Sequence, residues 1–145
     1  MTKEQKDLLK RVICAMLPYG VKATTTSNGW NGIYTVTGYK DDRIYLDCPM
    51  YDEGDDEWLV ESVKPYLRPM SSMTGEERRE YNSFIGGQQP YDSDYSAYPK
   101  EHKYIYERDV VYLVNWLNSN HFDYRGLLPL GLAIEVTKEN NPYKD

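Results

Sequence analysis

The spacing of apolar residues predicts a helix at the start of the chain. Between residues 3 and 17, apolar side chains recur about one helical turn apart, at Leu8, Leu9, Val12, Ile13, Met16 and Leu17. This period is typical of an amphipathic helix with one buried face. Thr2 and Gln5 have the spacing of a capping box, in which each side chain bonds the other residue's backbone N–H. Pro18 and Gly20 predict the end of the helix, because neither residue continues one readily.

The hydrophobic period then changes to that of short strands. The β-rich stretches between residues 18 and 63 are VKATTT, IYTVTGY, RIYLDC and EWLVESV, and turn-forming clusters such as SNGWNG separate them. Short β-branched segments at this spacing predict a small antiparallel sheet. That sheet is either curled and open or closed into an SH3-like barrel.

A proline-containing strap follows, with the sequence KPYLRPMSSM over residues 64–73. Pro65 and Pro69 lack the backbone N–H that a strand donates, and each holds the preceding residue in an extended conformation. We therefore predict an extended connection between the sheet and a helix. Thr74, with a Glu three residues later, predicts that this helix spans residues 75–84.

The C-terminal half is predicted to contain a second helix and a closing strand. Apolar side chains on one face predict a helix over residues 106–118, and LAIEV predicts a strand. Residues 86–103 are polar, Tyr-rich and without periodicity, which is typical of a long, mobile surface loop. Residues 137–145 are predicted to be a frayed tail.

Together these elements predict an α+β fold in a single domain over residues 1–145. The order is an N-terminal helix, a small antiparallel curled sheet or SH3-like barrel, two helices and a closing C-terminal strand. The β-rich half spans about residues 18–63, and the helical half spans residues 74–136. Hydrophobic residues make up 40% of the 145 positions, which is enough for one ordinary core.

The net charge of −6 is concentrated at one edge of the protein. Residues 40–57 hold two basic and eight acidic side chains, and the rest of the chain is balanced. No stripe of Lys and Arg is visible, which makes nucleic acid an unlikely partner. In the alternative that the β-rich half binds nucleic acid, Trp30, Tyr34 and Tyr39 would be its stacking platforms.

The distribution of apolar residues also bears on localisation. No window approaches the roughly 18 consecutive apolar residues of a membrane span, and the charged N-terminal segment does not match a signal peptide. We therefore expect a cytoplasmic protein with no membrane association. Cys14 and Cys48 form no CxxC pair, so we expect reduced thiols, no zinc set and no cofactor.

An acidic cluster is the first candidate site. Asp52, Asp55 and Asp56 offer oxygen ligands of the kind that Ca²⁺ or Mg²⁺ prefers, although their spacing is not that of an EF-hand. The alternative is a solvated hairpin tip whose charges prevent edge-to-edge aggregation. We favour the hairpin tip and predict no metal site.

His121 and Asp123 are a second candidate. Two residues apart, they are typical of a catalytic pair or of metal ligands, but no nucleophile motif accompanies them. In the structural alternative, His121 bonds the last carbonyls of the preceding helix and Asp123 caps the next turn.

Arginine and tyrosine supply the candidate binding residues. Arg68 and Arg125 each have aromatic or apolar neighbours, so each is suited to tie the strap to the C-terminal turn or to bind an anion. The chain has 15 Tyr against two Phe. Tyr91, Tyr95 and Tyr98 fall among Ser, Asp and Gly, a mixture typical of adaptable binding loops.

Two stretches, KPYLRPMSSMT and WLNSNHFDYRGLLPLGLAIEV, carry a resemblance. They resemble a group of small uncharacterised proteins of prophages and mobile elements of anaerobic gut bacteria. In that group a Pro-Tyr-Leu-Arg-Pro strap precedes a capped acidic helix, and a Trp-Leu-Asn…His-Phe-Asp-Tyr-Arg-Gly-Leu run leads into a closing strand. The resemblance covers roughly residues 60–84 and 113–136. It implies a phage or mobile-element setting and assigns no chemistry.

The sequence therefore predicts a non-catalytic module that binds another protein through a Tyr-rich surface. One alternative is a cation-dependent or hydrolytic enzyme that uses the acidic cluster or the His121 and Asp123 pair. The other is nucleic-acid binding by the β-rich half.

Overall fold

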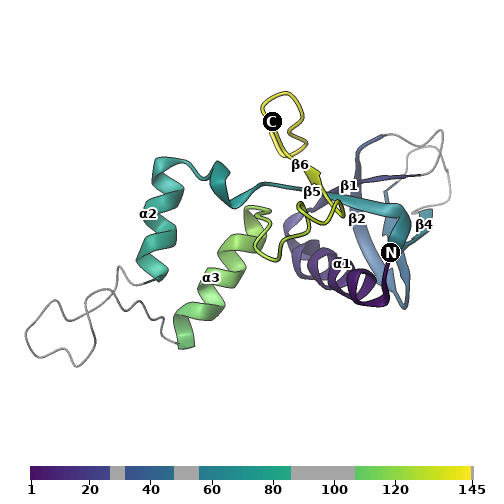
Figure 1. The fold of residues 1–145 in the computed structure, drawn as a ribbon, viewed down its shortest axis with the longest axis horizontal. Coiled ribbons are helices and arrows are strands. Elements are labelled where there is room, and N and C mark those ends of the chain that lie inside the picture. The colour runs from purple at the N-terminus through teal and green to yellow at the C-terminus, as the bar shows by residue number, and fades with distance from the viewer. Residues whose placement is uncertain (27–31, 48–55, 86–106, 145) are drawn as a thin grey trace, which may run out of the picture. The chain divides into compact units, whose positions relative to one another are not determined.

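The computed structural model describes residues 1–26, 32–47, 56–85 and 107–144, and Figure 1 shows their fold. The fold is α+β, as the sequence predicts. The chain divides into two compact units. The first unit comprises Met1–Met70 and Asn118–Asp145, and the second comprises Ser71–Leu117. Each unit is described by itself.

The N-terminal helix α1 (Lys3–Met16) forms as predicted. Both hydrogen bonds of the capping box are present: the Gln5 N–H donates to the Thr2 hydroxyl (3.1 Å), and the Thr2 N–H donates to the Gln5 side chain (3.0 Å). Pro18 lies in the 3₁₀ turn that follows the helix. Gly20 then takes a left-handed conformation with φ of +69°, which glycine adopts without strain.

Six strands form one open sheet. Their bounds are β1 Lys22–Thr25, β2 Tyr34–Lys40, β3 Arg43–Leu46, β4 Asp56–Leu59, β5 Val63–Leu67 and β6 Ile134–Glu135. The order is β4-β3-β2-β1-β5-β6. Neighbouring strands are antiparallel, except that β5 and β6 are parallel. Within the described part of the chain, β4 and β6 are the outermost strands and do not pair with each other, so the sheet is not closed into a barrel.

The strap predicted over residues 64–73 is in part an interior strand. Residues 63–67 form β5 between β1 and β6, and Met70–Ser72 form a 3₁₀ turn. The Val136 N–H donates to the Leu67 carbonyl (2.9 Å). Backbone N–H and C=O groups point to alternate sides along a strand. The nitrogen of Pro65, which carries no hydrogen, therefore faces β6, as the Leu67 carbonyl does. Pairing with β6 begins only at Tyr66, so no ladder bond is lost at the proline.

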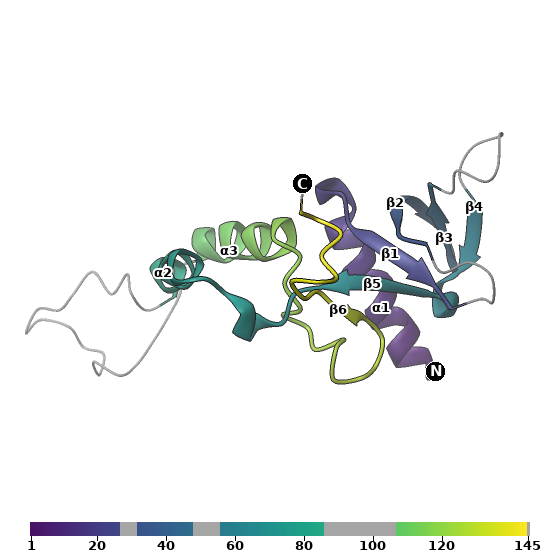
Figure 2. The same cartoon turned by 90° about the horizontal axis from the view of Figure 1, so that it is seen from above.

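The core of the first unit lies between α1 and one face of the sheet (Figure 2). Its buried side chains are Leu9, Val12, Ile13, Met16, Val21, Ala23, Val36, Ile44, Leu46, Val60, Val63, Leu67, Leu127 and Leu132. The last two come from the turn that precedes β6. A segment far along the chain therefore completes the core that the N-terminal half begins.

The second unit contains the helices α2 (Gly75–Phe84) and most of α3 (Glu107–Ser119). The capping box at Thr74 forms, so the predicted start of α2 is confirmed. Within this unit the rings of Phe84 and Trp116 lie 6.3 Å apart. The loop predicted over residues 86–103 falls outside the described residues. Among the described residues, no helix is long and apolar enough to cross a membrane.

Candidate functional site

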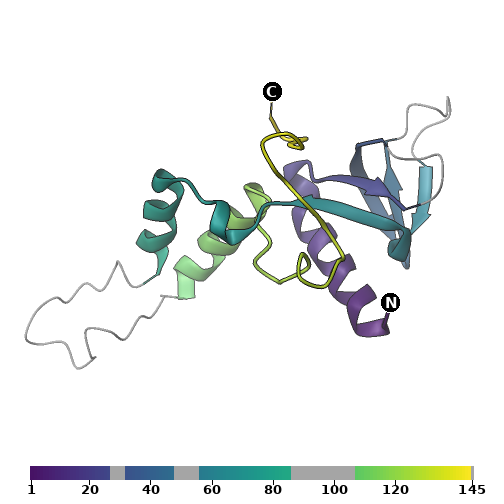
Figure 3. The ribbon, with the colours of Figure 1, turned by 45° about the horizontal axis from the view of Figure 1, so that its top comes forward.

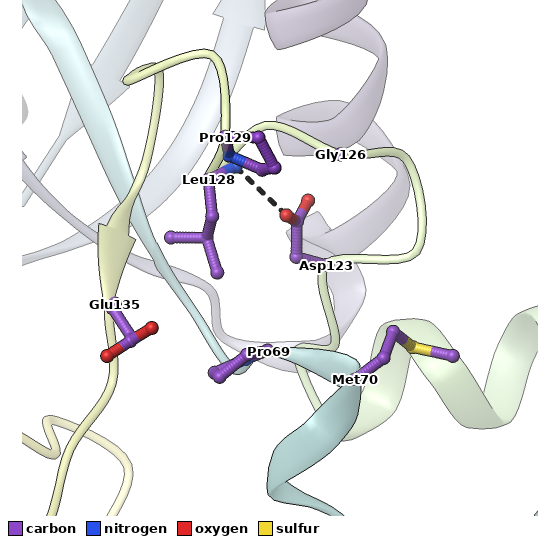
Figure 4. Close-up of a pocket in the computed structure, with 7 residues that line it drawn as sticks. All are labelled: Pro69, Met70, Asp123, Gly126, Leu128, Pro129 and Glu135. Atoms are coloured by element: carbon purple, nitrogen blue, oxygen red, sulfur yellow. Dashed lines mark hydrogen bonds between the residues drawn. The ribbon is translucent and has the colours of Figure 1, made fainter.

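A cavity of about 470 Å³ lies in the first unit, where the end of the strap meets the C-terminal turn and β6 (Figure 4). Its lining residues are Pro69, Met70, Asp123, Gly126, Leu128, Pro129 and Glu135. We call it the strap pocket. Most of the lining side chains are apolar, and the two charged ones are carboxylates.

Backbone hydrogen bonds bring the walls of the strap pocket together. The Arg68 N–H donates to the His121 carbonyl (2.8 Å), and the Asp123 N–H donates to the Arg68 carbonyl (2.8 Å). These bonds form a parallel β-bridge between Arg68 and Phe122. The bridge is parallel, as is the pairing of β5 with β6. The strap and the turn, which are far apart in sequence, therefore share one rigid backbone frame.

Asp123 builds the turn on one side of the strap pocket. Its two carboxylate oxygens accept the backbone N–H groups of Leu127 (2.7 Å) and Leu128 (2.9 Å), and Figure 4 shows the second bond as a dashed line. Gly126 has φ of +79°, which lets the chain reverse between them. The side chain of Asp123 is a turn cap, as predicted.

His121 bonds the end of the helix as predicted, and its ring has a further partner. Its backbone N–H bonds the Asn118 carbonyl (3.1 Å), but its ring Nε2 lies 2.9 Å from the carbonyl oxygen of Tyr19. A neutral imidazole with its proton on Nε2 satisfies this contact. His121 itself has φ of +60°, a left-handed conformation that is uncommon for a residue other than glycine.

The environment of the His121 ring favours this neutral form. The ring stacks on Tyr143 with a centroid distance of 3.7 Å and an interplanar angle of 7°. Burial lowers the pKa of His121, and the charge of Arg68 lowers it further, against the raising effect of the bond to Tyr19. His121 and Asp123 bond different partners, so they do not form the dyad that hydrolytic chemistry needs.

The two candidate arginines direct their side chains onto aromatic rings. The guanidinium of Arg68 lies 4.2 Å from the ring centroid of Phe122, and that of Arg125 lies 5.8 Å from the ring of Tyr124. Neither lines the strap pocket. Arg68 does tie the strap to the C-terminal turn, and it does so through its backbone N–H and carbonyl.

Several predicted site residues fall outside the described part of the chain: Trp30, Asp52, Asp55, Tyr91, Tyr95 and Tyr98. Asp56 is the first residue of β4. Within the described ranges, no group of three or more His, Cys, Asp or Glu side chains is placed to hold a metal ion. Tyr34 is partly buried and packs against the hydrophobic core, whereas Tyr39 is 50% exposed.

Tyr143 is the structural residue that sequence reasoning missed. Its hydroxyl accepts the Lys22 N–H (3.0 Å) and donates to the Tyr66 carbonyl (2.7 Å). It therefore bridges β1 and β5 where the next ladder pair would form. Figure 3 shows the C-terminal segment, in yellow, passing over β5. The prediction of a frayed tail is wrong, and the one available signal was an aromatic side chain in a polar segment.

Comparisons with protein-family models, with curated proteins and with solved structures found no match.

Proposed function

We propose that this chain is a non-catalytic module that binds another protein, and that the strap pocket is one of its binding sites. The observation that carries the proposal is the pocket itself: a cavity of about 470 Å³ with mostly apolar walls and two carboxylates, of which that of Asp123 is held by two backbone N–H groups. Binding pockets commonly combine an apolar lining with a small number of oriented polar atoms.

The contacts of the titratable groups support binding over catalysis. A general base must be within reach of the proton that it removes. Both carboxylate oxygens of Asp123 already accept turn N–H groups, and the Nε2 atom of His121 is bonded to a backbone carbonyl. These bonds support a structural role for both side chains: Asp123 holds one wall of the pocket, and His121 is held against Tyr19.

The sequence features remain part of the proposal. The Tyr-rich segment that contains Tyr91, Tyr95 and Tyr98 would supply a second, adaptable contact. The acidic edge over residues 40–57 would steer a basic partner and raise its association rate. The resemblance of the strap and turn motifs supports a phage or mobile-element origin, and we propose the cytoplasm as the compartment.

Selection from a random peptide library on the immobilised full chain tests this function. Peptides that enrich would then be measured against Leu128→Gln, which places a polar group on the pocket wall. The matched control is Leu130→Gln, in the same turn, where the side chain is 48% exposed and does not line the pocket. We expect about a tenfold loss of affinity for the first variant and none for the control.

Two outcomes contradict the proposal in different ways. Peptides that bind Leu128→Gln as well as the parent would exclude the strap pocket. If deletion of residues 88–99 then abolished binding and left the melting temperature unchanged, the Tyr-rich segment would be the binding site. Absence of enriched peptides, with a thermal shift on adding Mg²⁺, Ca²⁺, Mn²⁺ or Zn²⁺, would favour the alternative of a cation-dependent enzyme.

A further inference from the structure

We propose that the strap pocket takes an arginine side chain of the partner, an inference that rests on the proposed function. The first argument is charge. Asp123 and Glu135 are the charged residues that line the pocket, and both are acidic. The basic groups nearest in sequence, Arg68 and Arg125, direct their guanidinium groups to the rings of Phe122 and Tyr124. A cation entering the pocket therefore meets carboxylates.

The second argument is the shape and chemistry of the walls. Pro69, Leu128 and Pro129 present flat or branched apolar surfaces, and Figure 4 shows the Leu128 side chain pointing into the space between Asp123 and Glu135. A long side chain with methylene groups and a planar charged end fits such walls. Arginine is favoured over lysine because its guanidinium is planar, weakly hydrated and able to bond two carboxylates at once.

The third argument is that Asp123 is held in place before any ligand arrives. Two backbone N–H groups fix its carboxylate at 2.7 and 2.9 Å, and each oxygen can still accept a further bond. A fixed acceptor loses little conformational entropy on binding. Glu135 lies in β6, whose backbone is set by its pairing with β5. Both carboxylates therefore belong to ordered backbone segments.

The test is an NMR titration of the full chain with small probes that differ only in their end groups. The probes are N-acetyl-arginine methylamide, its neutral citrulline analogue and N-acetyl-lysine methylamide. We expect the arginine probe to shift the amide signals of Leu127, Leu128 and Glu135 and to bind about tenfold more tightly than the citrulline probe. Glu135→Gln should weaken it about threefold, and Glu139→Gln, outside the pocket, should not.

Each contrary outcome separates this inference from the proposed function. If the citrulline or lysine probe binds as tightly as arginine, or if the arginine probe causes no shift at its solubility limit, the assignment of an arginine is wrong. The proposed function then still stands if selected peptides lose affinity for Leu128→Gln. If those peptides bind that variant unchanged, the strap pocket fails as a binding site together with the arginine assignment. The binding function itself fails only if no peptide is selected.

Discussion

At the residue scale, Asp123 contributes most to the form of the strap pocket. Its carboxylate caps the turn through two N–H groups, and the side chain is 9% exposed. Asp123→Ala leaves both donors without a partner and should lower the free energy of unfolding by about 2 kcal/mol. Urea unfolding measures the loss, with Glu139→Ala on the exposed tail as the control. Equal loss in both variants would mean that the cap does not stabilise the turn.

His121 makes a prediction about pH. In the folded state the pKa of His121 lies below its ordinary value of 6.5, and burial is the main cause. The unfolded chain then binds the proton more readily than the folded chain. The contribution of the neutral His121 ring to the free energy of unfolding is therefore complete above pH 6.5. It is lost as the pH falls from 6.5 toward the pKa of the folded state, with a slope of at most about 1.4 kcal/mol per pH unit.

Comparison with His121→Asn isolates this effect, because Asn tolerates the positive φ of this position. The stability difference between the parent and the variant should be constant above pH 7 and should shrink below 6.5. A difference that stays constant across both ranges would show that the ring does not titrate differently in the folded state. Unfolding by urea at several pH values gives these differences.

The role of a residue could be predicted from the sequence where its hydrogen-bond partner is close by in the chain. The caps at Thr2, Thr74 and Asp123 each bond a backbone N–H within four or five residues, so spacing alone indicates them. The partners of His121 and Tyr143 lie 102 and 121 residues away. No local pattern encodes a separation of that size, so the sequence indicated the bond of His121 to the nearby helix end but not the contact of its ring with Tyr19.

At the element scale, periodicity and turn residues predicted the helices within a residue or two. The strands were predicted less well, because strand pairing depends on partners that are distant in sequence. Pro65 illustrates the reason. A proline argues against an interior strand, yet β5 lies between β1 and β6. Pairing with β6 starts one residue later, and only the register reveals this.

Exchanging the proline position tests that account of β5. By strand alternation, the N–H of Lys64 faces β1, where Lys64 pairs with Thr24. Lys64→Pro removes a ladder bond and leaves its acceptor on β1 without a partner, which should cost about 3 kcal/mol. Pro65→Ala removes no bond, so its cost is limited to the lost packing of a buried ring and the entropy of the unfolded chain, about 1–2 kcal/mol. Chemical denaturation gives the free energy of unfolding of both variants. Equal losses in the two variants would contradict the assigned direction of the backbone groups.

At the scale of the whole molecule, the sequence left an open sheet and a closed barrel as alternatives, and it did not indicate the strap pocket. The sequence marked the strap and the C-terminal turn as distinctive, but it did not place them side by side. That placement depends on the bridge between Arg68 and Phe122 and on the parallel pairing of β5 with β6. Both are long-range contacts without a local signal. The sequence therefore indicated Arg68 and Arg125 as binding residues, and it did not indicate that the carboxylates of Asp123 and Glu135 share a pocket.

The C-terminal tail stabilises the sheet through one hydroxyl group. Burial raises the pKa of Tyr143, which keeps this hydroxyl protonated and able to donate to the Tyr66 carbonyl. Tyr143→Phe leaves that carbonyl and the Lys22 N–H without their bridge and should lower stability by about 1–3 kcal/mol. Amide hydrogen exchange at Lys22 should become faster. Tyr39→Phe, at a 50% exposed ring, is the matched control.

Removal of the tail after Lys138 tests the same contact from the side of His121. The ring of Tyr143 stacks on that imidazole at 3.7 Å, so truncation exposes the imidazole to water. Because burial is the main cause of the lowered pKa, the pKa of His121 should rise toward 6.5 in the truncated chain. NMR titration of the ring protons measures it. An unchanged pKa, with the fold intact, would mean that the strap and Arg68 set the environment of His121 and that the tail does not.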